Sequence, residues 1–282
     1  MTPFWSSQLA LALVLNAVVQ AIQIGAYAAR LAGVKSGRIA TSISLFNLFV
    51  TASRLANLVY APMLGTITDR AARSVRVPAL AGAALHQLDL QIRLIVLAGT
   101  FGTALGALLL PVFLYLFLRG IAAFERLGSV PRAILRLVDP RVMLGILRSV
   151  RIPPPATFAQ FRIRDVPANL LISNVVVTGI YAIGVVAATY ASVIDPADAR
   201  TAVLLSGIIN GIATIAFTLI VDPTSAYITD QAVKGERSIS EVKSLVFYLS
   251  LTAIVGTLLS QLILYPATVV IAFVAHLVNQ LR

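Results

Sequence analysis

Long apolar stretches alternate along the chain with shorter stretches that collect arginine and lysine. A helix that crosses the hydrocarbon of a bilayer needs about 20 mostly apolar residues. Six stretches meet this requirement, at about Phe4–Ala29, Ile39–Leu64, Leu94–Leu118, Val166–Val193, Thr201–Val221 and Leu245–Val274. The first lacks the basic residues that open a signal peptide, so we expect it to be retained as a helix. The pattern predicts an all-α, polytopic membrane protein with about six transmembrane helices.

Composition narrows the class of protein further. Of the 282 residues, 59% are hydrophobic and 12% are charged, whereas soluble domains carry about a quarter charged residues. The absence of cysteine excludes disulfide scaffolds, thiolate nucleophiles and metal sites built on cysteine. The two histidines, His86 and His276, match no metal-ligand spacing, and no P-loop is present, so we predict no metal, cofactor or ATP site. The net charge of +11 favours contact with anionic membrane lipids over binding of nucleic acid.

Arginine and lysine are divided unevenly between the loops. The first, third and fifth loops between the predicted helices hold 15 of these residues, and the other loops with the C-terminus hold 6. Cytoplasmic loops are usually the richer ones. We therefore expect the odd-numbered loops in the cytoplasm and both termini outside. The second loop, with Arg70, Arg73, Arg76 and Arg93, is also basic and weakens the asymmetry.

Residues 119–165 form the longest stretch outside the predicted helices, and arginines are frequent in it. Apolar residues recur there at every fourth position, at Ile134, Val138, Val142, Ile146 and Val150. This spacing predicts an amphipathic, arginine-rich helix that lies in the headgroup layer of the membrane. An equally good interpretation is that the arginines only set the orientation of the chain.

A short repeat relates the second and fifth predicted helices. The sequences Pro62–Ala71 and Pro223–Ala232 both consist of Pro, four residues, Ile-Thr-Asp, one residue and Ala. The repeat suggests one membrane domain made of two halves, residues 1–118 and 166–282, joined by residues 119–165. Because each half has three helices, the halves would run in opposite directions, as in transporters whose substrate site lies between inverted repeats. A chance match is the alternative.

Acidic residues are absent from the interior of the predicted helices. Asp69, Asp222 and Asp230 lie at helix ends and are candidates for a gating or structural role. Without buried carboxylates, we expect neither a proton relay through Asp or Glu nor the paired carboxylates of a membrane hydrolase.

Arg54 lies near the middle of the second predicted helix, and Asn47 and Asn57 share its face at steps of seven and three residues. An arginine at this depth costs at least about 2.5–3.5 kcal/mol, so it usually faces a cavity or a partner. A guanidinium matches phosphate or carboxylate with two parallel hydrogen bonds. We favour an anionic ligand over the two alternatives, an internal ion pair or bonds to the carbonyls of a broken helix.

Several blocks of the sequence resemble one family. They are Ala28–Ala40, Ser44–Asn47, Ser53–Asn57, Ala61–Gly65, Asp222-Pro223 and Thr229-Asp230. These blocks are similar to the Amj-type lipid II flippases, the bacterial alternates to the MurJ flippase. The similarity is dense over the first seventy or so residues and thin afterwards. Residues 65–70 also resemble the loop motif of major facilitator transporters, which would place the second loop in the cytoplasm, but six helices are half of that fold.

The resemblance to Amj implies a non-enzymatic protein of the bacterial inner membrane. It would move the undecaprenyl-pyrophosphate-linked peptidoglycan precursor, lipid II, to the outer leaflet. Arg54, with Asn47 and Asn57, would then bind the pyrophosphate in a hydrated cleft. The cations that would gather the headgroup at the cytoplasmic mouth are Arg30, Lys35 and Arg38. The alternatives are an exporter of another anionic lipid or solute, and a membrane scaffold of cell-envelope assembly.

Overall fold

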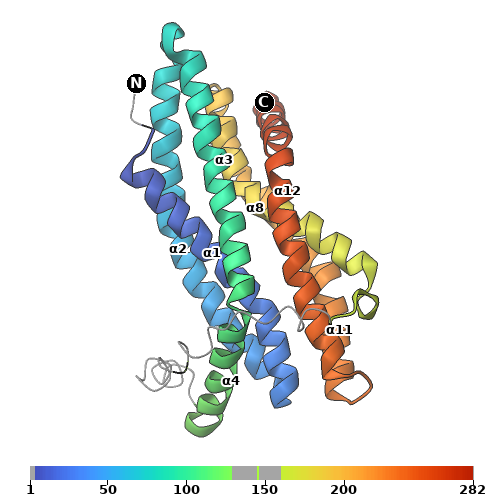
Figure 1. The fold of residues 1–282 in the computed structure, drawn as a ribbon. Coiled ribbons are helices and arrows are strands. Elements are labelled where there is room, and N and C mark those ends of the chain that lie inside the picture. Colours follow the sequence, from blue (N-terminus) through green and yellow to red (C-terminus); the bar gives the residue numbers. More distant parts are fainter. Residues whose placement is uncertain (1–3, 129–144, 146–159, 282) are drawn as a thin grey trace.

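In the computed structural model of the protein, the described residues are 4–128, 145 and 160–281, and they form a bundle of long helices (Figure 1). The longer elements are α1 (Ser7–Ser36), α2 (Ile39–Val75), α3 (Pro78–Leu108), α4 (Leu110–Leu127), α8 (Ala168–Ile194) and α12 (Ile239–Gln280). The shorter ones are η1 (Ile163–Asp165), α9 (Ala199–Leu204), α10 (Ser206–Ala216), η2 (Phe217–Val221) and α11 (Asp222–Val233). Within the described part, six helical stretches are long and apolar enough to cross a membrane, the run Ala199–Val233 being one of them. The predicted all-α fold with six transmembrane helices is confirmed.

Local sequence explains where two of the long helices end or begin. α1 ends at Gly37, whose φ of 69° is in the left-handed region that favours glycine. α12 begins with a capping box, in which Ser238 and Glu241 each accept a hydrogen bond from the backbone N–H of the other. Both signals lie at the end of the bundle opposite the two termini (Figure 1).

The bounds predicted for the third helix, Leu94–Leu118, are wrong. α3 begins at Pro78, and only two residues separate it from the end of α2 at Val75. Proline suits the first turn of a helix because its missing N–H would have no partner there. The predicted second loop is therefore a tight turn, and Arg70 and Arg93 lie within helices instead. The prediction failed because it followed the most apolar residues, whereas the helices continue beyond them.

A break divides the same predicted helix. Leu109 separates α3 from α4, and Pro111 stands in the first turn of α4, where its missing N–H cannot continue the ladder of α3. α4 changes direction at this point (Figure 1). Arg119 and Arg126, which were expected in a surface segment, lie in α4. Residues 129–144 and 146–159 of the predicted amphipathic segment lie outside the described residues.

The fifth membrane span is longer and less regular than the predicted Thr201–Val221. It runs from Ala199 to Val233 and contains a π-helical turn, η2. There the backbone N–H of Asp222 bonds to the carbonyl of Phe217, five residues earlier. The wider turn ends at Val221, two residues before Pro223, whose ring would clash with the preceding turn of a regular helix. Asp222 therefore lies inside a span, not at its end as predicted.

Glycines allow close helix crossings in both parts of the chain. A Cβ atom on Gly102 of α3 would lie 2.1 Å from the carbonyl oxygen of Ala17 in α1. A Cβ atom on Gly256 of α12 would lie 2.4 Å from the carbonyl oxygen of Val175 in α8. Both distances are below van der Waals contact, so a larger residue would push the helices apart. α1 thus packs on α3 in the way that α8 packs on α12.

Two apolar clusters connect the N-terminal helices to the C-terminal helices. The cluster nearer the termini includes Leu9, Leu64, Ile95, Ile183 and Leu264. The cluster nearer the opposite end includes Leu31, Leu170, Ile228, Leu245 and Leu249. Ile24, Tyr27 and Ala253 of the second cluster also line the cavity described next.

Candidate functional site

A cavity of about 250 Å³ lies among helices from both parts of the chain. Its walls come from α1, α2 and α3 on one side and from α8, α10, η2 and α12 on the other. The residues that line it are Gln20, Gln23, Ile24, Ala26, Tyr27, Phe46, Val50, Ser53, Arg54, Asn57, Thr103, Val177, Thr178, Tyr181, Ala213, Thr214, Phe217, Ala253 and Thr257. More than half of these side chains carry a hydroxyl, an amide or a charge, which is unusual inside a membrane bundle.

Among the described residues that line the cavity, Arg54 is the one that carries a charge. Its side chain is exposed, and it has no ion pair with any of the described residues. Asn57, one turn further along α2, lines the same cavity, and the buried Ser53 precedes Arg54. A guanidinium without a carboxylate, surrounded by neutral donors, suits an anion.

Asn47 does not join this group. It is exposed on α2 and is not among the residues that line the cavity. Its neighbour Phe46 and the residue one turn on, Val50, face the cavity instead. One residue along a helix rotates the side chain by about 100°, which is enough to separate Asn47 from the cavity. The structure thus brings together two of the three predicted ligand contacts, Arg54 and Asn57.

Arg30 has an acidic partner that the sequence did not reveal. It lies in α1, and its guanidinium forms an ion pair with the carboxylate of Asp222 in α11. The side chain of Arg30 is only 11% exposed, and that of Asp222 is 42% exposed. The internal ion pair, one of the alternatives for Arg54, is therefore found at Arg30 instead. It joins two helices through residues that are 192 positions apart in the sequence.

A second polar contact accompanies this ion pair. The hydroxyl of Tyr27, one turn before Arg30 and at the wall of the cavity, donates to the side-chain oxygen of Asn174 in α8 (3.0 Å). The amide nitrogen of Asn174 donates in turn to the carbonyl of Leu249 (2.9 Å) and to the hydroxyl of Thr252 (2.9 Å) in α12. Tyr27 and Arg30 thus connect α1 to α8, α11 and α12 at one end of the cavity.

Lys35 and Arg38, which were predicted beside Arg30, have different surroundings. The guanidinium of Arg38 pairs with the carboxylate of Glu125 in α4 (2.8 Å), and both side chains are largely exposed. Lys35 lines a separate apolar groove between α1, α3, α4 and α12. The three cations therefore do not converge on one mouth in this conformation.

Asp69 and Asp230, the acidic residues of the short repeat, are both exposed. Neither has an ion pair within the described residues. Asp69 lies in the part of α2 that approaches the turn to α3, and Asp230 lies in α11 at the opposite end of the bundle (Figure 1). The inverted arrangement of two halves remains a prediction.

A polar network that the sequence reasoning missed lies nearer the termini. In α3, Arg93 Nε lies 2.8 Å from Asp89 Oδ2. Arg93 also donates to the carbonyl of Gln261 in α12 (3.2 Å), and Gln261 donates to the carbonyl of Arg93 (2.9 Å). The hydroxyl of Tyr190 in α8 donates to Asp89 (3.3 Å). The spacing of four residues between Asp89 and Arg93 is the sequence signal for this ion pair. The predicted helix bounds, however, put both residues in a loop.

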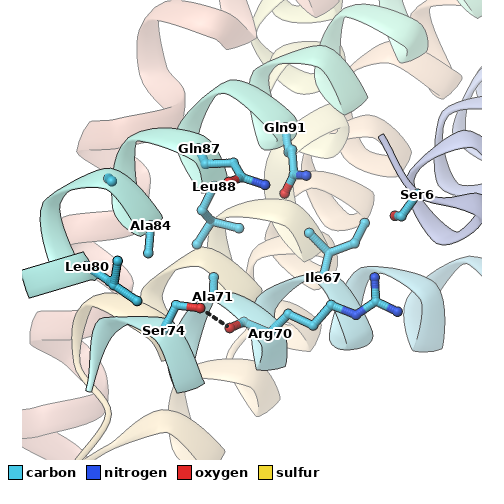
Figure 2. A pocket seen from close by; sticks show the side chains of 11 residues that line it. Ser6, Ile67, Arg70, Ala71, Ser74, Leu80, Ala84, Gln87, Leu88 and Gln91 are labelled. Atoms are coloured by element: carbon cyan, nitrogen blue, oxygen red, sulfur yellow. Dashed lines mark hydrogen bonds between the residues drawn. The ribbon is translucent and has the colours of Figure 1, made fainter. Parts of the chain in front are cut away.

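A third cavity, of about 40 Å³, lies between α2 and α3. Figure 2 shows Gln87, Leu88 and Gln91 of α3 opposite Ile67 and Arg70 of α2. A space of this size holds about one or two water molecules. It is too small for an organic substrate, so the candidate site is the larger cavity at Arg54.

One cluster has the composition of a metal site. Potential ligand atoms of Asp195, Asp198 and His276 lie within 4.8 Å of one another. The carboxylate of Asp198 already accepts hydrogen bonds from Asn279 (2.5 Å) and from His276 (3.0 Å), and these bonds hold the pKa of Asp198 below its usual range. The bonds tie the loop after α8 to the end of α12. We interpret this cluster as a structural contact, which sequence spacing alone could not reveal.

Comparison with known proteins adds independent information. A family model described as "Amj: Alternate to MurJ" matches residues 15–275. The chain is 35% identical over 257 residues to a protein of Bacillus subtilis (strain 168) named "Lipid II flippase Amj". That similarity covers 91% of this chain and 92% of the relative. No solved structure matches the chain.

Proposed function

The chain belongs to the Amj family of alternates to MurJ, and from this membership we propose that it is a lipid II flippase. It carries the undecaprenyl-pyrophosphate-linked precursor from the cytoplasmic to the outer leaflet for cell wall synthesis. It makes and breaks no covalent bond in that step. The observation that carries the proposal is Arg54, a cation with no ion pair among the described residues, in a cavity that is formed by both parts of the chain and lined by many side chains with a hydroxyl or an amide.

The chemistry of the substrate matches this cavity. A pyrophosphate loses its hydration when it enters a bundle of helices, and an uncompensated buried charge is very unfavourable. Arg54 supplies a charged donor, and Asn57 and Gln23 supply neutral donors beside it. The polyprenyl chain stays in the surrounding lipid, where its transfer has no comparable barrier.

In the described conformation, contacts between the helices restrict the space at this site. A disaccharide-pentapeptide headgroup is far larger than a cavity of about 250 Å³. Transport therefore requires the helices to separate, and the Arg30–Asp222 and Tyr27–Asn174 contacts cross the interface that has to open. We assign Asp222 a gating role on this basis. Arg38 contributes long-range attraction for the anionic headgroup, and we assign no substrate contact to Asn47, Asp69 or Asp230.

The orientation of the chain decides which leaflet the end of the bundle with the Arg30–Asp222 pair faces. The asymmetry of arginine and lysine favours an orientation with both termini outside and the Arg30–Asp222 end at the cytoplasm. Outward movement of an anion is then favoured by an inside-negative potential, by about 2.3 kcal/mol per charge per 100 mV. A reporter that is active only in the cytoplasm should work when fused near Arg136 and fail when fused after Arg282. The opposite pattern at both fusions would reverse the orientation.

The function is tested in cells that depend on this chain. The cell's other lipid II flippase is depleted while the chain is expressed, and lipid II in the outer leaflet is labelled. Arg54→Ala should abolish the labelling, and Arg54→Lys should retain part of it, because lysine keeps the charge but loses the planar fork.

Arg73→Ala is the matched control for this experiment. Arg73 is an exposed arginine of the same helix, with no ion pair among the described residues, and its loss should leave transport unchanged. Immunoblots confirm equal expression of all variants. If Arg54→Ala is well expressed and supports normal labelling, Arg54 does not bind the pyrophosphate. If the wild-type chain does not restore labelling, lipid II is not the substrate.

A further inference from the structure

A second cavity is larger than the one at Arg54. It is a groove of about 570 Å³ between α1, α3, α4 and α12. Most of its wall is aliphatic or aromatic, and its polar groups are few: Lys35, Lys243, Gln160 and Ser250. Such a groove is suited to a hydrocarbon chain and unsuited to a sugar or a peptide.

The break between α3 and α4 explains why this groove exists. α4 changes direction after Leu109 and carries Pro111 at the groove wall, so α3 does not continue straight alongside α1 and α12 (Figure 1). Three of the residues that line the groove are small: Ala28, Ala104 and Ala107. Small side chains leave the space between the helices unfilled.

The groove and the central cavity share two walls. α1 contributes Tyr27 to the cavity and Ala28 to the groove, and α12 contributes Ala253 to the cavity and Ile254 to the groove. An occupant of the groove therefore presses on helices α1 and α12, which also form the transport site.

Both lysines lie toward one end of the groove. Lys35 is in the last turn of α1 and Lys243 is in the second turn of α12, both are exposed, and neither has an ion pair with a described residue. The apolar wall continues along α12 as far as Ile254, a length of about 16 Å at 1.5 Å per residue. Cations at one end of a long apolar groove are the complement of a lipid with an anionic headgroup.

We propose that the groove binds one acyl chain of an anionic phospholipid, with the phosphate held by Lys35 and Lys243. The apolar wall along α12 is about 16 Å long, which is on the scale of one acyl chain. The undecaprenyl chain of the flipped substrate is more than twice as long as an acyl chain and does not fit in the groove as a whole. The site is therefore separate from the transport route and holds a lipid that braces α1 and α12.

The experiment uses the full chain, purified in detergent, and measures binding of phosphatidylglycerol and phosphatidylcholine by native mass spectrometry and by the shift in Tm. Phosphatidylglycerol should bind and raise the Tm, and phosphatidylcholine should bind more weakly. The Lys35→Ala/Lys243→Ala double variant should bind phosphatidylglycerol roughly 30-fold more weakly, because each lysine–phosphate contact strengthens binding about fivefold and the two effects multiply. Lys234→Ala removes one lysine from an exposed position outside the groove and should bind like the wild-type chain.

A second variant tests the apolar part of the site. Ala104→Phe fills the groove and should abolish the binding of phosphatidylglycerol while both lysines remain. Inorganic phosphate alone should not shift the Tm, because it lacks the chain. Equal binding of both phospholipids by the wild-type chain, or unchanged binding by the double variant, would overturn the proposal. Tighter binding of undecaprenyl phosphate than of phosphatidylglycerol would overturn the choice of a phospholipid as occupant.

Discussion

Arg30 and Arg54 are two arginines of membrane-spanning helices with opposite surroundings. Arg30 is 11% exposed and pairs with Asp222 of α11, beside the Tyr27–Asn174 contact. Arg54 is exposed to a cavity lined by amides and hydroxyls, and no described carboxylate pairs with it. Arg93 resembles Arg30, because it pairs with Asp89 and bonds to α12.

The difference separates two uses of a cation inside a membrane. A paired arginine is neutralised and connects helices, so its loss damages the fold. An unpaired arginine is tolerated where a polar, hydrated cavity replaces part of its hydration, and its charge remains available to a ligand. Three tests follow from this difference, in order of the expected effect.

The largest effect is expected when Arg54 is given a partner. Asn57→Asp places a carboxylate three residues along the same face of α2, within reach of the guanidinium. Lipid II labelling should fall to the level of cells without the chain, although Arg54 is still present. The measurement is surface labelling in flippase-depleted cells, with expression checked by immunoblot.

Asn47→Asp is the control for this test, because it adds the same charge to α2 outside the cavity. It should leave labelling close to the wild-type level. Normal labelling by Asn57→Asp would mean that the unpaired state of Arg54 is not needed for transport.

A smaller effect, on stability, is expected at the Arg30–Asp222 pair. Arg30→Gln and Asp222→Asn should each destabilise the chain by about 1–3 kcal/mol, less than the 3–5 kcal/mol of a fully buried pair because Asp222 is partly exposed. The double variant should lose less than the sum of the two. Thermal unfolding of the purified wild-type, single-variant and double-variant proteins measures these changes in stability.

Arg38→Gln is the matched control, since it breaks an exposed ion pair, with Glu125, near the same end of α1. It should change stability by about 0–1 kcal/mol. The Arg30–Asp222 double variant should also transport more lipid II than Arg54→Ala, because Arg30 binds Asp222 and not the substrate. Equal effects of Arg30→Gln and Arg38→Gln would contradict the assignment of Arg30 to an interhelical contact.

The smallest effect is expected at Asp89. Asp89→Asn removes one charge from a pair within α3, but Arg93 keeps its bond to the carbonyl of Gln261. A loss of about 0.5–1 kcal/mol in thermal unfolding is expected, with transport retained. Asp69→Asn, at an exposed residue without an ion pair in the described part, should have no effect. A loss of transport by Asp89→Asn would mean that this network acts in the mechanism.

Much of the site could be inferred from local sequence. Arg54 was identified because charge in an apolar stretch is rare, and Asn57 because it follows on the same helix face. Asn47 has nearly the same direction as Arg54 on a helical wheel, but at its level of the helix Phe46 and Val50 face the cavity instead. The partner of Arg30 was missed because Asp222 was placed at the end of a helix that in fact continues to Val233.

The sequence by itself determined the number of membrane spans, the class of fold and the presence of a cation within a span. These are properties of single segments, because removing an apolar stretch from water is favourable whatever its neighbours are. Only the tertiary structure decided that Arg30 is paired and Arg54 is not, and that a groove opens beside Pro111. Those outcomes depend on which helix faces pack against each other. The packing is determined by close crossings between helices far apart in the sequence, such as those at Gly102 and Gly256.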